Sequence, residues 1–456
     1  MKGPKACPAG FSFGMGHAIM NSDLRRIPRE RRTAMPVALS QRRFPFLDNR
    51  PLTGQRVYCT AIALLLILSE VFSSNIQSTL PAFSHLARLG LTGAGTLLLV
   101  VKCLFLTRYD RRWQWVVGCA AVVYAAFASL RGDDIWFLLA VLVGLGAKDV
   151  DLRTALRVYL GTAAVCLVLV QLLHYTTPLM PFNMYARNWD YGYGHYNGYG
   201  ARLLGVFFAW GWLRWPRLRW FDWAGLAALA AYTLIVPLCR GAGMAMLLLL
   251  LLFAAQKLLP RFFESRVWHF LVLALYPLLT VFSLVTGYLF DPGASDLTPK
   301  LSLLNRAFSG RLEIWHHVFW AFDYLHPAEE GAEAWLHAGM PNVITLLGGF
   351  ATDADVHHSI DNTYLALIMN KGLLGAVLVA GVTLLLLWRL CRTGHTGETL
   401  LLFAMLCYLL MENKMFLISA NPLILLLPCA LLTPRGAPLP ALCPRPAAQS
   451  REAAAV

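Results

Sequence analysis

Long apolar segments separated by short polar loops fill most of residues 57–433, and this pattern constrains the fold more than any other feature. A helix needs about 20 predominantly apolar residues to cross a bilayer. Of the 456 residues, 57% are hydrophobic and only 14% are charged, whereas soluble domains carry roughly 25% charged residues. The sequence therefore predicts an all-α polytopic membrane protein. We expect about twelve transmembrane helices, at 57–74, 86–106, 113–130, 134–147, 152–173, 201–213, 222–238, 241–257, 267–289, 362–388, 398–411 and 415–433.

The basic residues indicate how these segments are oriented. If the basic N-terminal tail lies inside and the segments cross in alternation, most of the 39 Lys and Arg residues fall in the tails and inner loops. Cytoplasmic loops of membrane proteins carry an excess of Lys and Arg, which is known as the positive-inside rule. The reverse orientation would break this rule at nearly every loop. We therefore expect a multi-pass protein of the plasma (inner) membrane with both termini cytoplasmic.

Two outer loops are longer than a connection between helices requires, and such loops are usually functional or disordered. The second contains amphipathic stretches that we expect to be partly helical. The predicted organisation is a basic disordered cytoplasmic tail at 1–56, nine transmembrane helices with the first long outer loop (174–200) at 57–289, a large extracytoplasmic loop at 290–361, three transmembrane helices at 362–433, and a cytoplasmic tail at 434–456.

The net charge of +14 raises the question of nucleic-acid binding. Such proteins gather their basic residues on one face or groove, whereas here the excess lies in the N-terminal tail and the short loops. We therefore exclude a nucleic-acid partner. The ten cysteines are scattered, mostly in apolar segments, and show no spacing typical of a metal site. We predict no metal and no cofactor.

The first outer loop contains RNWDYGYGHYNGYGAR, which joins arginines to aromatic residues and a His-x-Asn element between glycines. The tyrosines offer flat faces of the kind that stack on sugars. We interpret Arg187, Asn197 and Arg202 as substrate-binding residues and His195 as a catalytic residue. The alternative is an aromatic belt at the membrane interface, which explains the tyrosines but not the His-x-Asn element.

Three further arginines fall on the outer side, where the positive-inside rule disfavours them. Arg240 in CRGAG begins an apolar helix, so its guanidinium could pair with two phosphate oxygens beside a helix N-terminus. Arg306 and Arg311 flank Ser-Gly in the second loop. We interpret Arg240 and Arg311 as catalytic and Arg306 as substrate-binding. The alternatives are a snorkelling arginine for Arg240 and a solvated amphipathic helix for the other two.

The segment DVHHSIDNTYL precedes the tenth apolar segment. A histidine near a bound hydroxyl could act as general base, so we interpret His358 as catalytic. Asp361, Asn362 and Tyr364 are interpreted as substrate-binding, with helix capping as the alternative for the first two. Glu70 is a carboxylate well inside an apolar segment, where ionisable residues are functional candidates by default; Arg88 is one candidate partner for it.

Taken in order, GYGHYNGYG, CRGAG, SGRL, DNTYL and KGLLG resemble the motifs of Wzy-type polysaccharide polymerases, which share their overall plan with O-antigen ligases. The resemblance covers about 57–433. It departs from the usual polymerase pattern at Tyr196, where proline is common. The ligases more often have a His-Asn pair before the tenth helix, and His357 and His358 keep that alternative open.

The resemblance implies a metal-independent glycosyltransferase at the outer face of the plasma membrane. Its donor would be a glycan on undecaprenyl diphosphate, and its acceptor another lipid-linked repeat unit (polymerase) or a lipid A core or similar anchor (ligase). A chain-length regulator and a flippase would be the expected protein partners. Arg240 and Arg311 would neutralise the leaving diphosphate, and His358 or His195 would deprotonate the acceptor hydroxyl. A transporter is the remaining alternative, but it predicts internal repeats and charges at the membrane midplane.

Overall fold

A computed structural model describes residues 51–433 apart from 133, 182–183, 186–187, 216, 291–297, 326–343 and 349–359. These residues lie within the unit Phe46–Val456, and the separate unit Met1–Pro45 lies outside the described residues. The elements are α3 (Pro51–Glu70), α4 (Ile76–Thr79), α5 (Pro81–Phe105), α6 (Arg112–Arg131), α7 (Ile135–Gly146), α8 (Leu152–Thr176), β1 (Met184–Tyr185), β2 (Asn188–Trp189), α9 (Tyr196–Arg214), α10 (Trp220–Ile235), α11 (Arg240–Leu258), α12 (Pro260–Phe263), α13 (Arg266–Leu289), α14 (Thr298–Ala307), α15 (Arg311–Leu325), α16 (Thr363–Thr393), α17 (Thr396–Leu409), η2 (Pro422–Leu426) and α18 (Leu427–Leu431).

The regular secondary structure of the described residues is helical apart from the small antiparallel pair of strands β1 and β2. Six helices are long and apolar enough to cross a membrane, namely α5, α6, α8, α11, α13 and α16. Their side chains are mostly not buried within the protein, as expected for helices that face lipid. The predicted helical membrane protein is therefore confirmed at this coarse level, while the number of twelve crossings stays a prediction.

The predicted apolar segments coincide closely with the helices, and the differences concern the first and the last segment in the chain. α3 begins at Pro51, inside the stretch predicted to be a disordered tail. The last predicted segment, 415–433, is not one helix. Asn421 accepts a hydrogen bond from the Leu423 N–H and starts the 3₁₀-helix η2 with Pro422, and α18 follows directly. The residues before Asn421 form a loop that is buried at Ile418, Ser419 and Ala420, so proline and asparagine chemistry overrides the apolar pattern there.

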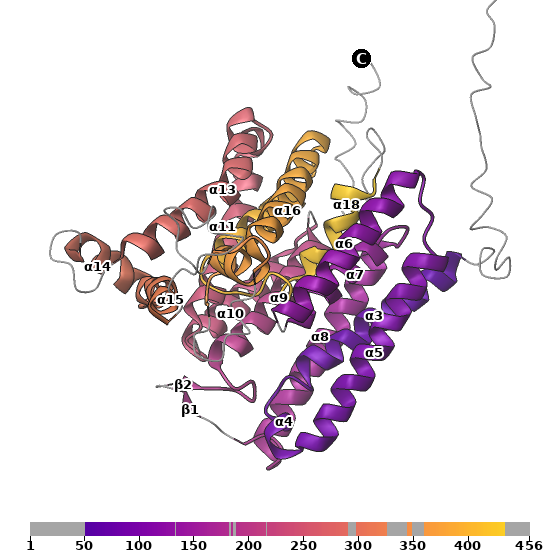
Figure 1. Cartoon of the computed structure of the whole chain (residues 1–456), viewed down its shortest axis with the longest axis horizontal. Coiled ribbons are helices and arrows are strands. Elements are labelled where there is room, and N and C mark those ends of the chain that lie inside the picture. Colours follow the sequence, from indigo (N-terminus) through magenta and orange to yellow (C-terminus); the bar gives the residue numbers. More distant parts are fainter. Residues whose placement is uncertain are drawn as a thin grey trace, which may run out of the picture. The chain divides into compact units, whose positions relative to one another are not determined.

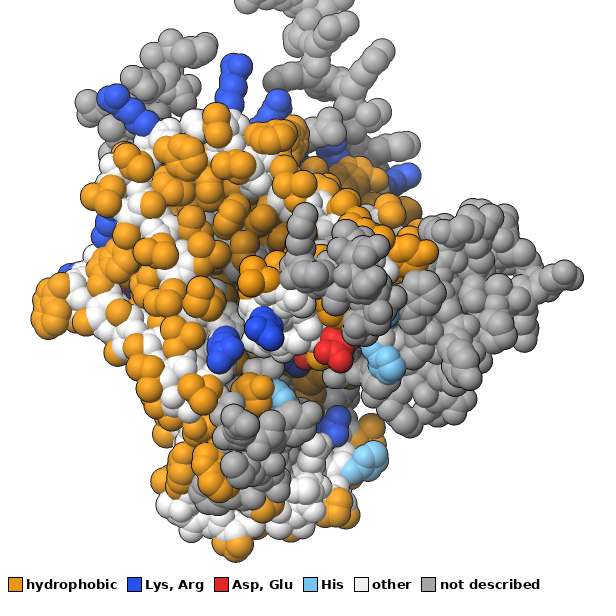
Figure 2. Space-filling view, turned by 90° about the vertical axis from the view of Figure 1, so that its left-hand side faces the viewer, with side chains coloured by type: hydrophobic (Ala, Val, Ile, Leu, Met, Phe, Trp, Pro, Cys, Tyr) orange, Lys and Arg blue, Asp and Glu red, His pale blue; other side chains and the backbone are white. Residues whose placement is uncertain are grey.

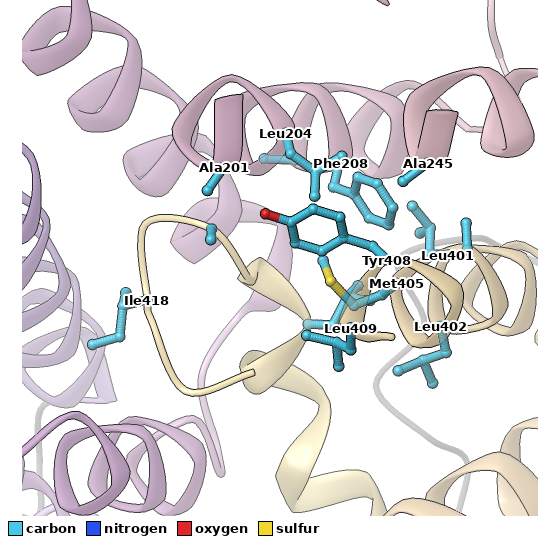
Figure 3. Close-up of a cluster of buried hydrophobic side chains, with 14 of the residues drawn as sticks. Ala201, Leu204, Phe208, Ala245, Leu401, Leu402, Met405, Tyr408, Leu409 and Ile418 are labelled. Carbon is cyan, nitrogen blue, oxygen red and sulfur yellow. The ribbon is translucent and has the colours of Figure 1, made fainter. Parts of the chain in front are cut away.

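Neighbouring helices pack in a bundle in which α3 lies against α5 and α8, and α9 lies against α8, α10 and α11 (Figure 1). α13 contacts both α15 and α16. The core around α17 shows how close this packing is. Figure 3 shows Tyr408 and Met405 of α17 facing Leu204 and Phe208 of α9, with Ala245 of α11 beside them. All five side chains are almost completely buried.

α16 is interrupted at Gly372, whose φ of 71° and ψ of 174° are not helical. The N–H groups of Leu373 and Leu374 donate instead to the carbonyls of Thr345 (3.0 Å) and Leu346 (3.1 Å). Backbone groups freed by a helix break need partners where water is absent. The short segment 344–348 of the large loop therefore completes the hydrogen bonding of α16 and is fixed to it.

Gly372→Ala should destabilise the protein because φ near +71° strains any residue with a Cβ, and this Cβ would collide with backbone atoms of Gly348 and Leu346. A strained φ alone costs about 1–3 kcal/mol. Gly381→Ala, in the same helix with nothing within 4 Å of its added Cβ, is the matched control and should be neutral or slightly stabilising. Thermal unfolding in detergent measures both, and equal melting temperatures would contradict the expectation.

Candidate functional site

Glu412 is the centre of a polar cluster that joins four parts of the chain. It lies just after α17, with only 2% of its surface exposed. Nη2 of Arg311, the first residue of α15, lies 2.8 Å from the Glu412 carboxylate, and its Nε donates to the Met411 carbonyl at 2.8 Å. The Thr363 hydroxyl at the start of α16 donates to the Glu412 carbonyl at 2.8 Å. The loop helix α15 and the helix α16 are therefore fixed to the same short segment.

The N-terminal ends of α9 and α11 meet this segment from the other side. The Cys239 thiol, directly before α11, lies 3.5 Å from the Asn197 side-chain oxygen in the first turn of α9. Gly200 permits this approach, because a Cβ there would collide with the Cys239 sulfur. A Cβ at Gly241 would lie 3.5 Å from the Met411 Cβ. The starts of four helices, α9, α11, α15 and α16, therefore converge.

These N-termini differ in how their first N–H groups are satisfied. His195 accepts from the Asn197 N–H in α9, Asn362 accepts from the N–H groups of Tyr364 and Leu365 in α16, and Asn305 accepts from those of Leu312 and Glu313 in α15. In α11 the preceding residue makes no such side-chain hydrogen bond. The Ala242 N–H lies against the Cys239 sulfur, which is a weak acceptor. Among these four helices in the described part of the chain, the positive end of α11 is thus the most open one, and an anion is stabilised at such an end.

Arg240 occupies the first position of this open helix. Its side chain is exposed and makes no ion pair or hydrogen bond with any residue in the described part of the chain. A cation at the positive end of a helix is unfavourable without an anion nearby. Arg112 and Arg266 also begin helices, but on the predicted cytoplasmic side, where basic residues are preferred. Arg240 and the open N–H groups of α11 together form an anion-binding arrangement.

His195 is held in a defined tautomer. Its Nδ1 accepts a hydrogen bond from the Asn197 backbone N–H at 3.0 Å, so the proton of the neutral ring is on Nε2. Partial burial lowers the pKa of His195, as do the positive charges of Lys414 and Arg311, while Asp361 opposes them. The neutral ring is therefore favoured near pH 7, and it presents an N–H donor rather than a base.

Some of the charges around Glu412 raise its pKa and others lower it. Burial raises the pKa of Glu412 to about 7; Asp361 adds to this rise, while Lys414 and Arg311 oppose it. Asp361 itself is only half-buried, and its charge acts on His195 and Tyr196 as well as on Glu412. Asp361 is thus the more accessible of the two carboxylates. Figure 2 shows basic, acidic and histidine side chains gathered around a hollow on this face, below a broad hydrophobic surface.

The sequence predictions fall into three groups. Arg240, Arg311, His195, Asn197 and Asp361 lie in this cluster. The others that the structure describes have places of their own: Asn362 donates to the Ser283 hydroxyl, Tyr364 donates to the Leu406 carbonyl from a buried position, and Arg306 is exposed in the last turn of α14. Arg187, His357 and His358 lie outside the described residues.

Arg202 is buried in the bundle and forms a different network. Its Nε lies 3.2 Å from the Glu70 carboxylate, and its two terminal nitrogens donate to the carbonyls of Gly198 and Ser69 at 2.8 Å each. The Tyr193 hydroxyl also donates to Glu70. Glu70 therefore pairs with Arg202 and not with Arg88, whose side chain donates to Gln77. The network joins α3 to α9.

Sequence reasoning missed Glu412 and Lys414 as members of the cluster. Both lie in MENKM, a short polar stretch between two apolar segments that was interpreted only as an outer loop. A carboxylate and a cation two residues apart on the predicted outer side are the signal that could have marked them. Arg311, the partner of Glu412, is 101 residues away from it in the chain, so the pairing itself has no local signature.

In comparisons with models of protein families, with curated proteins and with solved structures, none matches this chain.

Proposed function

We propose that this chain is a membrane-embedded polysaccharide polymerase. It transfers a glycan from undecaprenyl diphosphate to another lipid-linked repeat unit at the outer face of the plasma membrane. The observation that carries the proposal is the N-terminus of α11, where Arg240 has no partner among the described residues, beside the cluster that holds Arg311, His195 and Asp361. The motif resemblance in the sequence supports the same reaction class.

The diphosphate of the donor fits the basic part of this cluster. Two phosphate groups carry negative charge that increases on one oxygen as the glycosyl bond breaks. Arg240 and the N–H groups at the start of α11 would bind the diphosphate, and Arg311 would share the developing charge. A lipid diphosphate is a good leaving group once it is neutralised, so no general acid is needed on that side of the reaction.

The acceptor hydroxyl fits the other part of the cluster. Asp361, half-buried and electrostatically coupled to His195, would accept the hydroxyl proton as general base. The His195 Nε2–H would donate a hydrogen bond that orients the acceptor or the sugar. The acceptor oxygen then attacks the anomeric carbon, the bond to the phosphate oxygen breaks with its electron pair, and the configuration inverts. From the sequence, His195 or His358 is the expected base. Because the Nδ1 of His195 already accepts a hydrogen bond, we assign the role of base to Asp361 instead.

Deletion of the gene in its host should remove long surface glycans and leave single repeat units attached to the surface. This follows because a polymerase joins repeat units but does not attach them to their anchor. Glycans from the surface and from the lipid carrier, resolved by size on a gel, measure the effect. Complementation with the intact gene is the control and should restore the ladder of chain lengths.

Two other outcomes of the deletion would contradict the polymerase. Long chains that accumulate on the lipid carrier and are absent from their anchor would identify a ligase. Unchanged glycans would contradict both enzymes and favour a transporter for an unrelated substrate.

A further inference from the structure

Glu412 holds one of the two arginines that the proposed reaction needs, and the reaction as described does not use this carboxylate. We propose that Glu412 is a positioning residue that keeps Arg311 paired while the site is empty and releases it, by taking up a proton from solution, when a diphosphate binds. This inference rests on the proposed anion site at α11 but adds a regulation that this function does not require.

The geometry of the pair shows why Arg311 is held. The Arg311 side chain is 10% exposed and that of Glu412 is 3% exposed, and their closest atoms lie 2.8 Å apart. A buried charge without a partner is strongly unfavourable. Without an anion in the site, each side chain therefore depends on the other. Arg311 still has donor capacity, since Nη1 makes no hydrogen bond with the described residues.

A bound diphosphate changes this balance. Its negative charge competes with Glu412 for the Arg311 guanidinium, and the two anions would lie in one poorly solvated cluster. Like charges in such a cluster favour protonation of one of them. Glu412 is the member that protonates most easily, because burial already raises its pKa to about 7. Binding of the anion is therefore expected to be coupled to uptake of a proton.

The surroundings of Glu412 contain few groups that could replace it in this role. The titratable and charged side chains that act on it or feel its charge come from every element around it: Arg311 of α15, Asp361 before α16, Cys239 before α11, Tyr196 of α9, Tyr408 of α17, and Lys414 of its own segment. Burial raises the pKa of the Cys239 thiol to about 12, so it stays protonated near neutral pH. Asp361 is the remaining carboxylate among them, and it serves as the comparison variant because its charge acts on Glu412 without contacting Arg311 in the described hydrogen bonds.

The test is the number of protons taken up when inorganic pyrophosphate binds to the full-length protein in detergent. Calorimetric titrations at pH 7.5 in two buffers of different ionisation enthalpy give this number. We expect uptake of about half a proton per pyrophosphate in the wild type, from a carboxylate that changes from partly ionised to mostly protonated. Glu412→Gln should abolish the uptake, whereas Asp361→Asn should reduce it without abolishing it, because Asp361 contributes to the raised pKa of Glu412.

The affinity of the Glu412→Gln variant for pyrophosphate distinguishes a positioning role of Glu412 from a purely structural one. Because the variant lacks the competing charge, it should bind pyrophosphate more tightly, by roughly tenfold. A structural role predicts weaker binding instead. Equal proton uptake in wild type and Glu412→Gln, weaker binding in a folded Glu412→Gln, or no binding of pyrophosphate to the wild type would each overturn the inference.

The wild type provides a second test if Glu412→Gln does not fold. Its affinity for pyrophosphate should fall as the pH rises from 6 to 8, by up to about tenfold per unit above pH 7, because an ionised Glu412 retains Arg311. Pyrophosphate itself gains negative charge over this range, so an affinity that rises with pH would contradict the inference. If pyrophosphate binding is linked to proton uptake but the deletion strain has unchanged surface glycans, the proposed polymerase is rejected while the role of Glu412 stands.

Discussion

Arg240→Ala should abolish long surface glycans while the protein remains present in the membrane at its normal level. The side chain is exposed and unpaired among the described residues, so its removal should not affect folding. It nevertheless lies at the open positive end of α11, where the leaving diphosphate is proposed to bind. Loss of one preorganised donor to developing charge typically lowers a rate by about 100- to 1000-fold. Gel analysis of glycan length, with immunoblotting of the membrane fraction, measures both quantities.

Two companion variants make this test specific. Arg88→Ala removes another exposed arginine on the predicted outer side, near the start of α5, and should leave the glycans unchanged. Arg240→Lys keeps the charge but loses the planar pair of donors, so an intermediate loss of polymer is expected. Normal glycan length in a well-expressed Arg240→Ala strain would reject the proposed role of Arg240.

The helices could be predicted from the sequence because each depends on local apolar composition. Segments such as 152–173 and 267–289 match α8 and α13 within a few residues. The prediction fails where local chemistry opposes composition, as at Asn421 and Pro422, where a loop and two short helices stand in place of an expected long helix. It also does not reveal the break at Gly372, because that break depends on backbone partners from a loop far away in the chain.

The candidate site was partly predictable for a different reason. Arg240 and Arg311 can be identified because arginine is disfavoured on the predicted outer side. His195 can be identified because it stands in a His-x-Asn element between glycines. Their true partners could not be derived, because ion pairs between distant segments leave no pattern in a sequence. Arg202 illustrates the consequence: it meets the same criterion as Arg240, yet it is buried against Glu70, a pairing that the sequence does not indicate. Glu412, in contrast, was overlooked because a carboxylate in an outer loop is ordinary.

Glu70→Leu should strongly destabilise the protein, by about 3–5 kcal/mol, because it leaves the Arg202 charge buried without its counter-ion. Glu70 is fully buried and 5% of Arg202 is exposed, so water cannot replace the lost partner. Thermal unfolding of the purified protein in detergent measures the effect. Leu301→Ala, a substitution at a partly buried position of α14, gives a scale for ordinary loss of packing.

The double variant Glu70→Leu/Arg202→Leu distinguishes a structural Arg202 from a substrate-binding one. Replacing both members of a buried ion pair by apolar residues is often neutral, so most of the lost stability should return. If Arg202 serves only to join α3 and α9, the double variant should also still produce long glycans. A stable double variant that makes no polymer would instead mean that Arg202 contacts the substrate, as the sequence alone suggested, and that the network with Glu70 belongs to the site.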